Sequence, residues 1–584
     1  MKGEKNNRRI ADAALGHEPA DTVIRDGVLM DVYTGRILPG RSVAIKDRWI
    51  AYVGPDVRHT IGKNTEIIEA SGRLMCPGYI DAHTHLATYW DIADFLAYTI
   101  PCGITTHFAE AEAYVFILGA EGFKIFLDQI ENQPVKIYGL IPPMVSLSPA
   151  SEPLLINRDE IKDLLQDPRV MGLGESFWQG TIMTRDNRVL ELIQETLKAG
   201  KSVEGHAAGA FDTKLAAYAG AGALSCHEAI STDDVLSRLE LGLYAMIREG
   251  DIRRDLEIIL PLKDRIDLRR VILVTDGTNP IDLVKRGYMI DVIQKAVDMG
   301  FKPIEAVQMV TINPAEHFGL DHLMGGIAPG RYADILLLPE DGMMKPELVI
   351  SEGRVVARNG KTAVEIPGTP YHGDLLKTVR VDSVSSSDLA VPVHGPGDIR
   401  TIDIQPGGLV TREGKAAPKV INGRLEADPE RDLLKIVFIE RTSGQGEKFV
   451  GFIRGWGQKK GAAATTLCWD AGAIVAVGAN DQDLVAAVNR IIEIQGGAVV
   501  CVDGAFLAEI PLNIGGFISQ LKMPEIAGRL EAFQKTLASL GSTLTFTHLT
   551  LNVLSTAAIP FIRMTEKGYY RLKENDFVNL TIQK

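Results

Sequence analysis

The sequence predicts an α/β protein built around a (β/α)8, TIM-like barrel, with a composite β-sandwich domain and a C-terminal α/β domain. Three observations support this fold class. Short apolar segments alternate with helical segments over residues 75–318, and repeated β-then-α units give a parallel sheet that closes when about eight follow one another. Segments rich in short strands flank this region on both sides. A second α/β pattern begins near residue 401.

The barrel region is recognised from its alternating segments. Apolar, β-prone segments predict strands, and longer amphipathic segments between them predict helices. The expected strands lie at Ile80 and residues 105–108, 135–140, 170–173, 202–204, 223–225 and 271–274. The expected helices include residues 156–165, 188–199 and 281–299.

The rest of the chain divides into three parts. Short strands with turn residues occur on both sides of the barrel, which predicts one β domain formed by residues 1–74 together with 319–365. Residues 366–400 are rich in proline, glycine and serine and predict a linker. Residues 401–584 predict a separate α/β domain.

The composition excludes several function classes. The 584 residues are 46% hydrophobic and 23% charged, which is typical of a soluble globular protein. A net charge of −13 argues against a nucleic-acid-binding surface. No run of about eighteen apolar residues occurs, so no membrane span is expected. The N-terminal residues lack the apolar core of a signal peptide. The five cysteines are scattered, as expected of a protein in the reducing cytoplasm.

The segment Pro77-Gly-Tyr-Ile-Asp-Ala-His-Thr-His85 is the most informative in the chain. It follows an apolar run that predicts a short buried strand broken by one turn. Residues two apart on a strand point to the same side, so His83 and His85 can direct two imidazoles to one point. A lone His-x-His is more often a pair of ordinary histidines on a half-exposed strand. Here the segment predicts a metal site, because further ligands follow downstream.

Four more ligand-type residues end predicted strands: Glu175, His206, His227 and Asp276. In a barrel the carboxyl ends of all strands meet at one mouth, where function is located. Six such ligands suit two divalent metal ions bridged by one carboxylate and a water molecule. The predicted metal ligands are His83, His85, Glu175, His206, His227 and Asp276.

This ligand set predicts hydrolysis. Two divalent ions lower the pKa of a bridging water and give hydroxide near neutral pH. Asp276 can take the proton of that water and pass it to a leaving nitrogen. A metal ion or a histidine polarises the substituent on the electrophilic carbon. The predicted catalytic residues are therefore Asp276, Glu175 and His227, and the expected reaction is cleavage of a C–N bond at an sp2 carbon.

With these residues in view, the chain resembles the amidohydrolase superfamily and, within it, a divergent member of the adenine deaminase family. The resemblance is carried by residues 77–85, 172–175, 222–228, 242–250, 306–315 and 326–334, and by the C-terminal segments 452–457 and 488–497. It implies a (β/α)8 barrel with a composite β domain. It also implies two manganese or iron ions per chain, with zinc as a further candidate. A homodimer and the hydrolysis of adenine to hypoxanthine and ammonia are implied as well.

The chain departs from the family pattern around the expected pocket. It has His83-Thr-His-Leu-Ala-Thr-Tyr89 where the family has His-(Val/Ile)-His-Ile-Glu-Ser-Ser. It has Ala109-Glu-Ala-Glu-Ala113 in place of Ala-Asp-Pro-His-Glu, and Thr275-Asp-Gly-Thr-Asn-Pro280 in place of Thr-Asp-Asp-Arg-His-Pro. In the C-terminal domain, Trp469-Asp-Ala-Gly-Ala473 replaces His-Asp-Ser-His-Asn. The metal-binding residues are thus retained while the pocket wall is rewritten.

The rewritten wall leaves the substrate open. A small N-heterocycle, planar or cyclic, is expected, and the candidate substrate-binding residues are Tyr89, Trp90, Glu110, Glu112, Glu204, Arg248 and Trp469. For the aromatic residues, filling of the core is the commoner role. Glu204 can equally be a carboxylate that orients a metal-binding imidazole or a carboxylate at the surface. Arg248 can equally form a structural ion pair.

Three hypotheses remain at this point. The first is a binuclear hydrolase with adenine deaminase as its nearest named activity. The second is a ring-opening hydrolase of cyclic amides or other purines. The third is a family member that has lost activity and serves as a scaffold. Retention of all six predicted ligands argues against the third, and a count of bound metal ions separates it from the other two.

Overall fold

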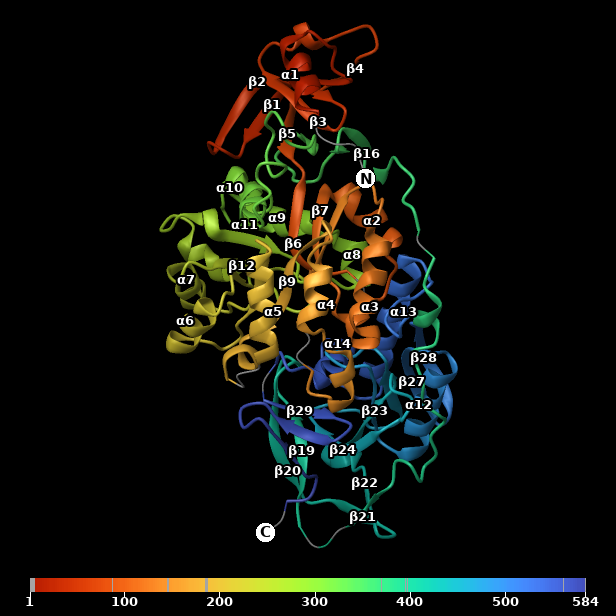
Figure 1. Ribbon diagram of the computed structural model, residues 1–584. Helices are drawn as coiled ribbons and strands as arrows, with labels where there is room; N and C mark the ends of the chain where they lie inside the picture. The colour runs from red at the N-terminus through yellow and green to blue at the C-terminus, as the bar shows by residue number, and fades with distance from the viewer. Residues whose placement is uncertain are drawn as a thin grey trace.

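The computed structural model describes residues 6–86, 88–143, 146–183, 187–368, 370–393, 395, 397–559 and 561–582. The chain forms three parts stacked along one long axis (Figure 1). A β domain lies at one end, the barrel lies in the middle, and the C-terminal part lies at the other end. Among the described residues, no helix is both long and apolar enough to cross a membrane.

The β domain is one mixed sheet that joins strands from the two flanks of the barrel. Its nine strands are β1 (Thr22–Asp31), β2 (Arg36–Lys46), β3 (Trp49–Gly54), β4 (Glu66–Glu69), β5 (Arg73–Pro77), β14 (Ile335–Pro339), β15 (Leu348–Ser351), β16 (Arg354–Arg358) and β17 (Lys361–Thr362). The two flanks meet where β14 pairs antiparallel with β5. Helix α1 (Asn7–Leu15) packs on this sheet, with Ile10 and Ala13 against Trp49.

Among the described residues the barrel has eight strands, and every ladder that pairs two of them is parallel. They are β6 (Tyr79–His85), β7 (Ile104–Glu110), β8 (Lys136–Ile141), β9 (Val170–Phe177), β10 (Ser202–His206), β11 (Ser225–Cys226), β12 (Tyr244–Arg248) and β13 (Val271–Val274). The backbone N–H of Leu224 donates to the carbonyl of Val203 at 2.9 Å, which joins β11 to β10. The N–H of Asp276 donates to the carbonyl of His83 at 3.1 Å, which joins the end of β13 to β6. These bonds close the ring of strands, as the sequence predicts.

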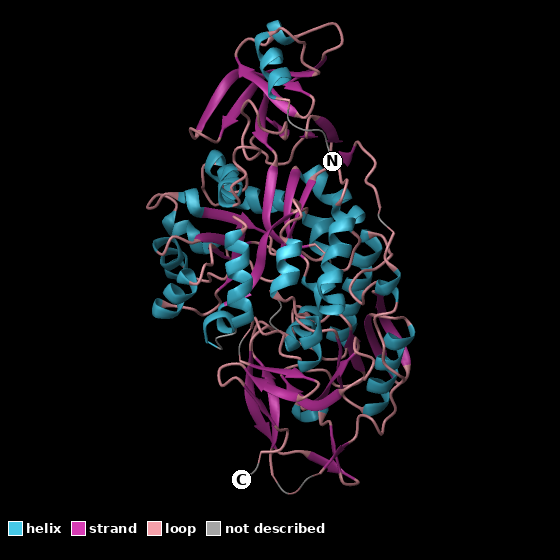
Figure 2. Ribbon diagram, in the orientation of Figure 1, coloured by secondary structure: helices cyan, strands magenta, loops and turns pink. Residues whose placement is uncertain are grey.

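Helices cover the outside of the barrel (Figure 2). They are α2 (Ile92–Thr99), α3 (Glu112–Ile130), α4 (Arg158–Leu164), α5 (Asn187–Lys198), α6 (Asp212–Gly220), α7 (Thr232–Glu240), α8 (Pro280–Arg286), α9 (Met289–Asp298), α10 (Pro303–Gln308) and α11 (Ile312–His317). Helix α5 shows why these segments are helical: Val189, Leu192, Ile193 and Thr196 recur every three or four residues and are all buried.

Two details of the barrel differ from the sequence prediction. Strand β12 was not among the expected strands, although its residues 245–248 are buried. The expected single helix over residues 281–299 is wrong, because the chain breaks between α8 and α9. Gly287 takes a φ of 90° at the break, which ends α8. The next residue, Tyr288, is buried and donates a hydrogen bond to Asp81 at 2.6 Å, so the break delivers a side chain to the barrel wall.

The C-terminal part is built on an eight-stranded sheet. Its strands are β19 (Ile399–Ile404), β20 (Thr411–Ala416), β23 (Leu434–Glu440), β24 (Lys448–Arg454), β25 (Ala462–Thr465), β26 (Ala473–Gly478), β27 (Gly497–Val502) and β28 (Ala505–Pro511). Smaller sheets contain β18 (Val391–Pro392), β21 (Lys419–Ile421), β22 (Arg424–Glu426), β29 (Ile562–Thr565), β30 (Gly568–Arg571) and β31 (Asp576–Val578). The helices are α12 (Asp481–Glu493), α13 (Met523–Ser539) and α14 (Thr547–Asn552).

The C-terminal part lies against the mouth of the barrel. The loop after β6 is bonded to it in both directions: Tyr89 N donates to Phe517 O at 2.8 Å, and Ser519 N donates to Tyr89 O at 2.9 Å. Met523 N also donates to the Asp94 carboxylate at 2.6 Å. The carboxyl ends of the barrel strands therefore face a second domain.

Candidate metal centre

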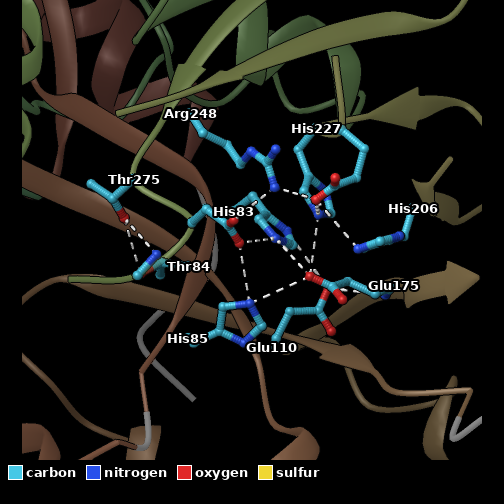
Figure 3. A network of polar contacts seen from close by, with 12 residues as sticks. His83, Thr84, His85, Glu110, Glu175, His206, His227, Arg248 and Thr275 are labelled. Carbon is cyan, nitrogen blue, oxygen red and sulfur yellow. Dashed lines mark hydrogen bonds and ion pairs between the residues drawn. The ribbon is translucent and has the colours of Figure 1, made fainter. Parts of the chain in front are cut away.

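The six predicted ligands occupy the carboxyl ends of the barrel strands. His83 and His85 end β6, Glu175 lies near the end of β9, and His206 is the last residue of β10. His227 follows β11 directly, and Asp276 follows β13 after one intervening residue. In Figure 3 the labelled histidines and Glu175 point toward one another from these different strands.

The first group of ligands surrounds the end of β6. Nε2 of His83 lies 3.2 Å from Glu175 Oε1 and 3.1 Å from Asp276 Oδ1. Nε2 of His85 lies 3.4 Å and 3.3 Å from the same two oxygens. One ligand atom from each of these four residues lies within 4.8 Å of the others, which is the spacing of side chains that can hold one cation.

A second group shares Glu175 with the first. Nε2 of His227 lies 3.3 Å from Glu175 Oε1, and His206 completes a set within the same 4.8 Å limit. A third set joins His227, Asp276 and Glu228. Two adjacent ligand sets with one carboxylate in common form the arrangement that a pair of divalent cations requires.

The charges in the centre depend on one another because His83, His206, His227 and Asp276 are buried and His85 and Glu175 are largely buried. Burial alone would lower the pKa of the His83 imidazole, but its contacts with Asp276 and Glu175 outweigh this and raise the pKa to about 10. Burial opposes the ionisation of Glu175, yet His83 and His85 hold its pKa well below the ordinary value. Burial, together with the neighbouring His83, holds the pKa of His227 well below its usual range. The carboxylates are therefore ionised and available as ligands.

Two glutamates lie behind His83 and His85, and of the two only Glu112 is within hydrogen-bond distance of a ring nitrogen. Glu112 Oε1 lies 2.7 Å from His85 Nδ1, on the side of the ring away from Asp276. Glu110 Oε1 lies 3.7 Å from His83 Nδ1 and accepts the backbone N–H of Glu175 at 3.2 Å. Gly174 leaves room for Glu110, since a Cβ there would stand 2.1 Å from Glu110 Oε2. A carboxylate in the position of Glu112 can fix the orientation of a metal-binding imidazole.

Arg248 is a buried cation among three carboxylates. It forms ion pairs with Glu228, with Asp255 at 3.3 Å and with Asp276 Oδ2 at 3.4 Å. It lines neither the pocket that contains His85 and Asp276 nor the adjoining one that contains Glu175. Arg248 is therefore placed to orient Asp276 and Glu228.

Asp81 ties the first and last strands of the barrel together. Its carboxylate accepts hydrogen bonds from Thr275 Oγ1 and Tyr288 Oη, both at 2.6 Å. Burial raises the pKa of Asp81 to about 6. Because Thr275 precedes Asp276 and Asp81 lies two residues before His83, this contact sets the distance between two predicted ligands.

A pocket of about 750 Å³ opens beside the centre, between the barrel mouth and the C-terminal part. It is lined by His85 and Asp276 and by three of the predicted substrate-binding residues, Tyr89, Glu112 and Trp469. Glu110 lines a smaller adjoining pocket of about 290 Å³ together with Glu175. The indole of Trp469 lies nearly parallel to the His85 ring, with centroids 6.1 Å apart and planes at 17°.

Three predicted substrate-binding residues lie elsewhere. Trp90 is buried against Phe95, and its indole N–H donates to the carbonyl of Leu86 at 2.9 Å. Glu204 is bonded to His317 at 2.9 Å and lies one layer below His206, because two residues along a strand separate neighbouring layers. Trp90 and Glu204 line neither of the two pockets beside the centre, and Arg248 is enclosed as described above.

The structure also brings residues to the centre that the sequence analysis did not select as site residues. Glu228 lies 3.3 Å from His206 Nε2 and 3.6 Å from His227 Nε2. From the sequence, Glu228, which follows His227, can equally be a carboxylate that orients an imidazole or one at the surface, as for Glu204. Asp470 lines both pockets. It stands where the quoted family motif also has an aspartate, which was a signal for its role.

Comparison with known proteins places these features in a family. Residues 74–356 match the amidohydrolase family, and residues 408–576 match the adenine deaminase C-terminal domain. An adenine deaminase of Moorella thermoacetica is 36% identical over 96% of this chain and 96% of its own length. Those of Rubrobacter xylanophilus and Clostridium botulinum are 33% and 30% identical, over 98% and 99% of this chain and 96% and 98% of their own lengths.

The family and the site agree. The matched segments contain the barrel, and the barrel carries clustered histidine, aspartate and glutamate side chains that could bind metal, as this metal-dependent family requires. The chain therefore belongs to the amidohydrolase family of hydrolytic enzymes and, within it, to the adenine deaminase family.

Proposed function

We propose that this enzyme hydrolyses adenine to hypoxanthine and ammonia at a centre of two divalent cations. The observation that supports this most strongly is the pair of ligand sets that share Glu175. The relatives named adenine deaminase align with nearly the whole chain, so the reaction is inferred for the full protein.

The residues present fit such a centre. His83, His85, Glu175 and Asp276 would hold one cation, and Glu175, His206 and His227 the other. A set of imidazole nitrogens and carboxylate oxygens suits Mn²⁺, Fe²⁺ or Zn²⁺, and manganese or iron is our choice by family resemblance. When bound, divalent cations lower the pKa of a water molecule toward neutrality.

Asp276 is the proposed proton carrier. Burial opposes its ionisation, but contacts with His83 and His85 hold its pKa far below the ordinary value, so it is a carboxylate at neutral pH. Its Oδ2 is held by Arg248 at 3.4 Å, while Oδ1 faces the two histidines. A carboxylate fixed in this way can accept the proton of the attacking water and deliver it to the leaving nitrogen.

Glu175 and His227 have supporting roles in the proposal. Glu175 supplies negative charge between the two ligand sets. His227 is neutral at physiological pH because its pKa is depressed, so its Nε2 lone pair is available as a ligand or as a hydrogen-bond partner. Nε2 of His227 and Oε1 of Glu175 lie 3.3 Å apart, so both side chains can act at one centre.

The pocket wall suits a flat ring. Trp469 offers an aromatic face beside His85, while Tyr89 and Glu112 lie in the same wall. An aromatic face favours planar heterocycles by stacking. These contacts support a purine in the pocket next to Asp276.

A second candidate is ring-opening hydrolysis of a cyclic amide or another purine. One observation favours it: Trp469 and Gly472 replace the two histidines of the family motif at the pocket. A site that loses polar partners for a ring edge discriminates less well among related rings. The same Asp276 carboxylate serves either reaction.

The test is a substrate screen with protein loaded with Mn²⁺ or Fe²⁺. Ammonia and hypoxanthine are measured with adenine, and ring opening is measured by loss of absorbance with a panel of cyclic amides and other purines. Rapid release of ammonia from adenine supports the first candidate. Turnover confined to cyclic amides would replace it with the second, and two bound metal ions without any turnover would contradict both.

We further infer a homodimer in the cytoplasm and the domain division stated from the sequence, namely 1–74 with 319–365, 75–318, 366–400 and 401–584. Family resemblance supports the homodimer, and the scattered cysteines support the cytoplasmic location. Light scattering after gel filtration tests the dimer, and limited proteolysis tests the boundaries.

A further inference from the structure

Asp470 projects from the C-terminal part into the space above the metal centre. It lines both the larger pocket, which contains His85 and Asp276, and the smaller one, which contains Glu110 and Glu175. Its backbone has a φ of 60°, a left-handed conformation that few residues other than glycine and asparagine adopt readily. This conformation turns Trp469 and Asp470 toward the same pocket, where both side chains line the wall.

The turn at Asp470 is held from several sides. Ser555 Oγ donates to the carbonyl of Trp469 at 2.7 Å, and Ser146 Oγ donates to the carbonyl of Asp470 at 2.6 Å. Trp469 N donates to Asn552 O at 2.9 Å. A polar group fixed in this way loses little conformational entropy when a ligand binds, which favours affinity and selectivity.

Among the described residues, the protein hydrogen-bonds one of the two carboxyl oxygens of Asp470. Oδ2 accepts hydrogen bonds from Thr556 Oγ1 and, at 3.2 Å, from Ala557 N. Among the described residues no hydrogen bond reaches Oδ1, and Oδ1 is not one of the enclosed atoms without a partner. Asp470 is 6% exposed, and it faces the pockets. Oδ1 is therefore available to a ligand.

Asp470 is not placed as a metal ligand. Among the described residues it belongs to none of the groups whose ligand atoms lie within 4.8 Å of one another. Burial, together with the nearby Glu175 and Glu112, raises its pKa to about 7. Near neutral pH its carboxyl group can thus donate a hydrogen bond or accept one, and the ring edges of planar N-heterocycles present both acceptor nitrogens and N–H donors.

We propose that Oδ1 of Asp470 hydrogen-bonds a ring nitrogen of the heterocyclic substrate, which makes Asp470 the specificity-determining residue that the C-terminal part contributes to the barrel active site. The proposal rests on the proposed function, since it concerns the same pocket. It also gives the C-terminal part a role: the barrel supplies the reacting groups, and Asp470 with Trp469 selects the ring.

Binding to variants tests this proposal. Asp470→Ala removes the hydrogen bond, and Asp470→Asn keeps the shape and the left-handed backbone. Asp483→Asn is the matched control, because Asp483 is a buried carboxylate of the same part that accepts the N–H of Gly504 and lines neither of the two pockets beside the metal centre. All are prepared in metal-loaded Asp276→Asn protein, so that the adenine dissociation constant is measured by calorimetry without turnover.

Asp470→Ala should weaken adenine binding by about tenfold or more, since a charge-assisted or buried hydrogen bond is lost. Metal content should be unchanged in every variant, which separates substrate contact from disruption of the centre. The dissociation constant of the control should change less than about twofold. Equal affinities for the parent protein, Asp470→Ala and Asp470→Asn would overturn the proposal.

Analogues identify the contacted atom. The analogues are adenines in which one ring nitrogen is replaced by carbon. One of them should bind the Asp276→Asn parent protein weakly, and Asp470→Ala should not weaken its binding further. The reason is that the analogue and the substitution each remove the same hydrogen bond. Independent effects for every analogue would contradict the contact. One outcome is that the enzyme with Asp276 intact fails to turn over adenine while the Asp276→Asn parent protein binds adenine and one analogue shows no additional loss with Asp470→Ala. In that case only the proposed function fails. Absence of binding by any planar heterocycle overturns both.

Discussion

Nδ1 of His85 lies 2.7 Å from Glu112 Oε1, while Nε2 of the same ring lies 3.3 Å from Asp276 Oδ1. The imidazole is thus held on both edges, and Glu112 fixes which nitrogen faces the metal centre. The family motif quoted above has a histidine at the position of Glu112. The side chain that supports His85 in this chain therefore lies at a position where the sequence differs from the family motif.

Glu112→Ala should weaken metal binding. Without the carboxylate, the His85 ring is free to rotate and is a weaker ligand, and loss of such a partner costs roughly 10–100-fold in metal affinity. The measurement is a competition between the protein and a chelating indicator for Mn²⁺. Glu121→Ala, which changes an exposed glutamate of the same helix, is the control and should leave the affinity unaltered. Equal affinities in both variants would show that Glu112 does not support the centre.

Asp276→Asn should reduce turnover by about 10²-fold or more, since the amide cannot accept the proton of the attacking water. The circular dichroism spectrum should change little, because the amide keeps the shape of the side chain, whereas the thermal midpoint should fall, because the amide weakens the ion pairs with His83, His85 and Arg248. Steady-state ammonia release from the first active substrate of the screen gives the rate. A variant that retains most of its turnover would rule out Asp276 as the proton carrier.

Metal loading should release protons. The pKa of His83 in the metal-free protein is about 10, so at pH 7.5 its ring carries a proton that must leave before the nitrogen can bind a cation. We expect about one proton or more per chain at pH 7.5, and tighter metal binding as the pH rises toward 10. Calorimetry in buffers of different ionisation enthalpy gives the number. A heat of binding that is independent of the buffer contradicts this charge assignment.

Asp470 should make the metal-free protein less stable as the pH rises. Its pKa of about 7 in the folded chain lies above the ordinary value of 3.8, so the folded state binds more protons between these values. The contribution of this group to the free energy of unfolding therefore decreases as the pH rises from about 4 to 7, so the folded protein becomes less stable. Asp470→Asn should lose less stability than the wild type between pH 5 and 8 in chelator-treated urea denaturation. Parallel profiles would contradict the raised pKa.

Arg248→Met should destabilise the protein strongly. The substitution leaves Glu228, Asp255 and Asp276 buried together without their shared cation, and breaking a buried ion pair from one side costs roughly 3–5 kcal/mol. The urea midpoint of metal-free protein measures the loss. Arg269→Met is the control, because the Arg269 side chain is 69% exposed. Similar midpoints for the two variants would mean that the carboxylates find another partner.

Local patterns in the sequence were sufficient for the framework of the site. The alternation of a strand directs His83 and His85 to one side whatever the rest of the chain does, because the two-residue repeat is a property of the backbone. The expectation that strand ends meet at one mouth follows from the parallel barrel itself. The family assignment and the barrel were confirmed for the same reason, since both depend on segments that are readable one at a time.

Contacts between distant segments were beyond the reach of those patterns. Glu204 and His206 lie on the same face of β10. Only their different depths in the barrel place His206 in the metal centre and Glu204 against His317. The break at Gly287 depends on Tyr288 reaching Asp81 across the barrel wall.

The sequence by itself determined which residue types end the barrel strands and what chemistry they can perform. Only the tertiary structure decided that Asp470, 194 positions beyond Asp276 in the chain, lines the same pocket. The reason is physical: the chemistry of a side chain is local, whereas its neighbours are selected by packing, burial and hydrogen bonds among segments far apart in the sequence.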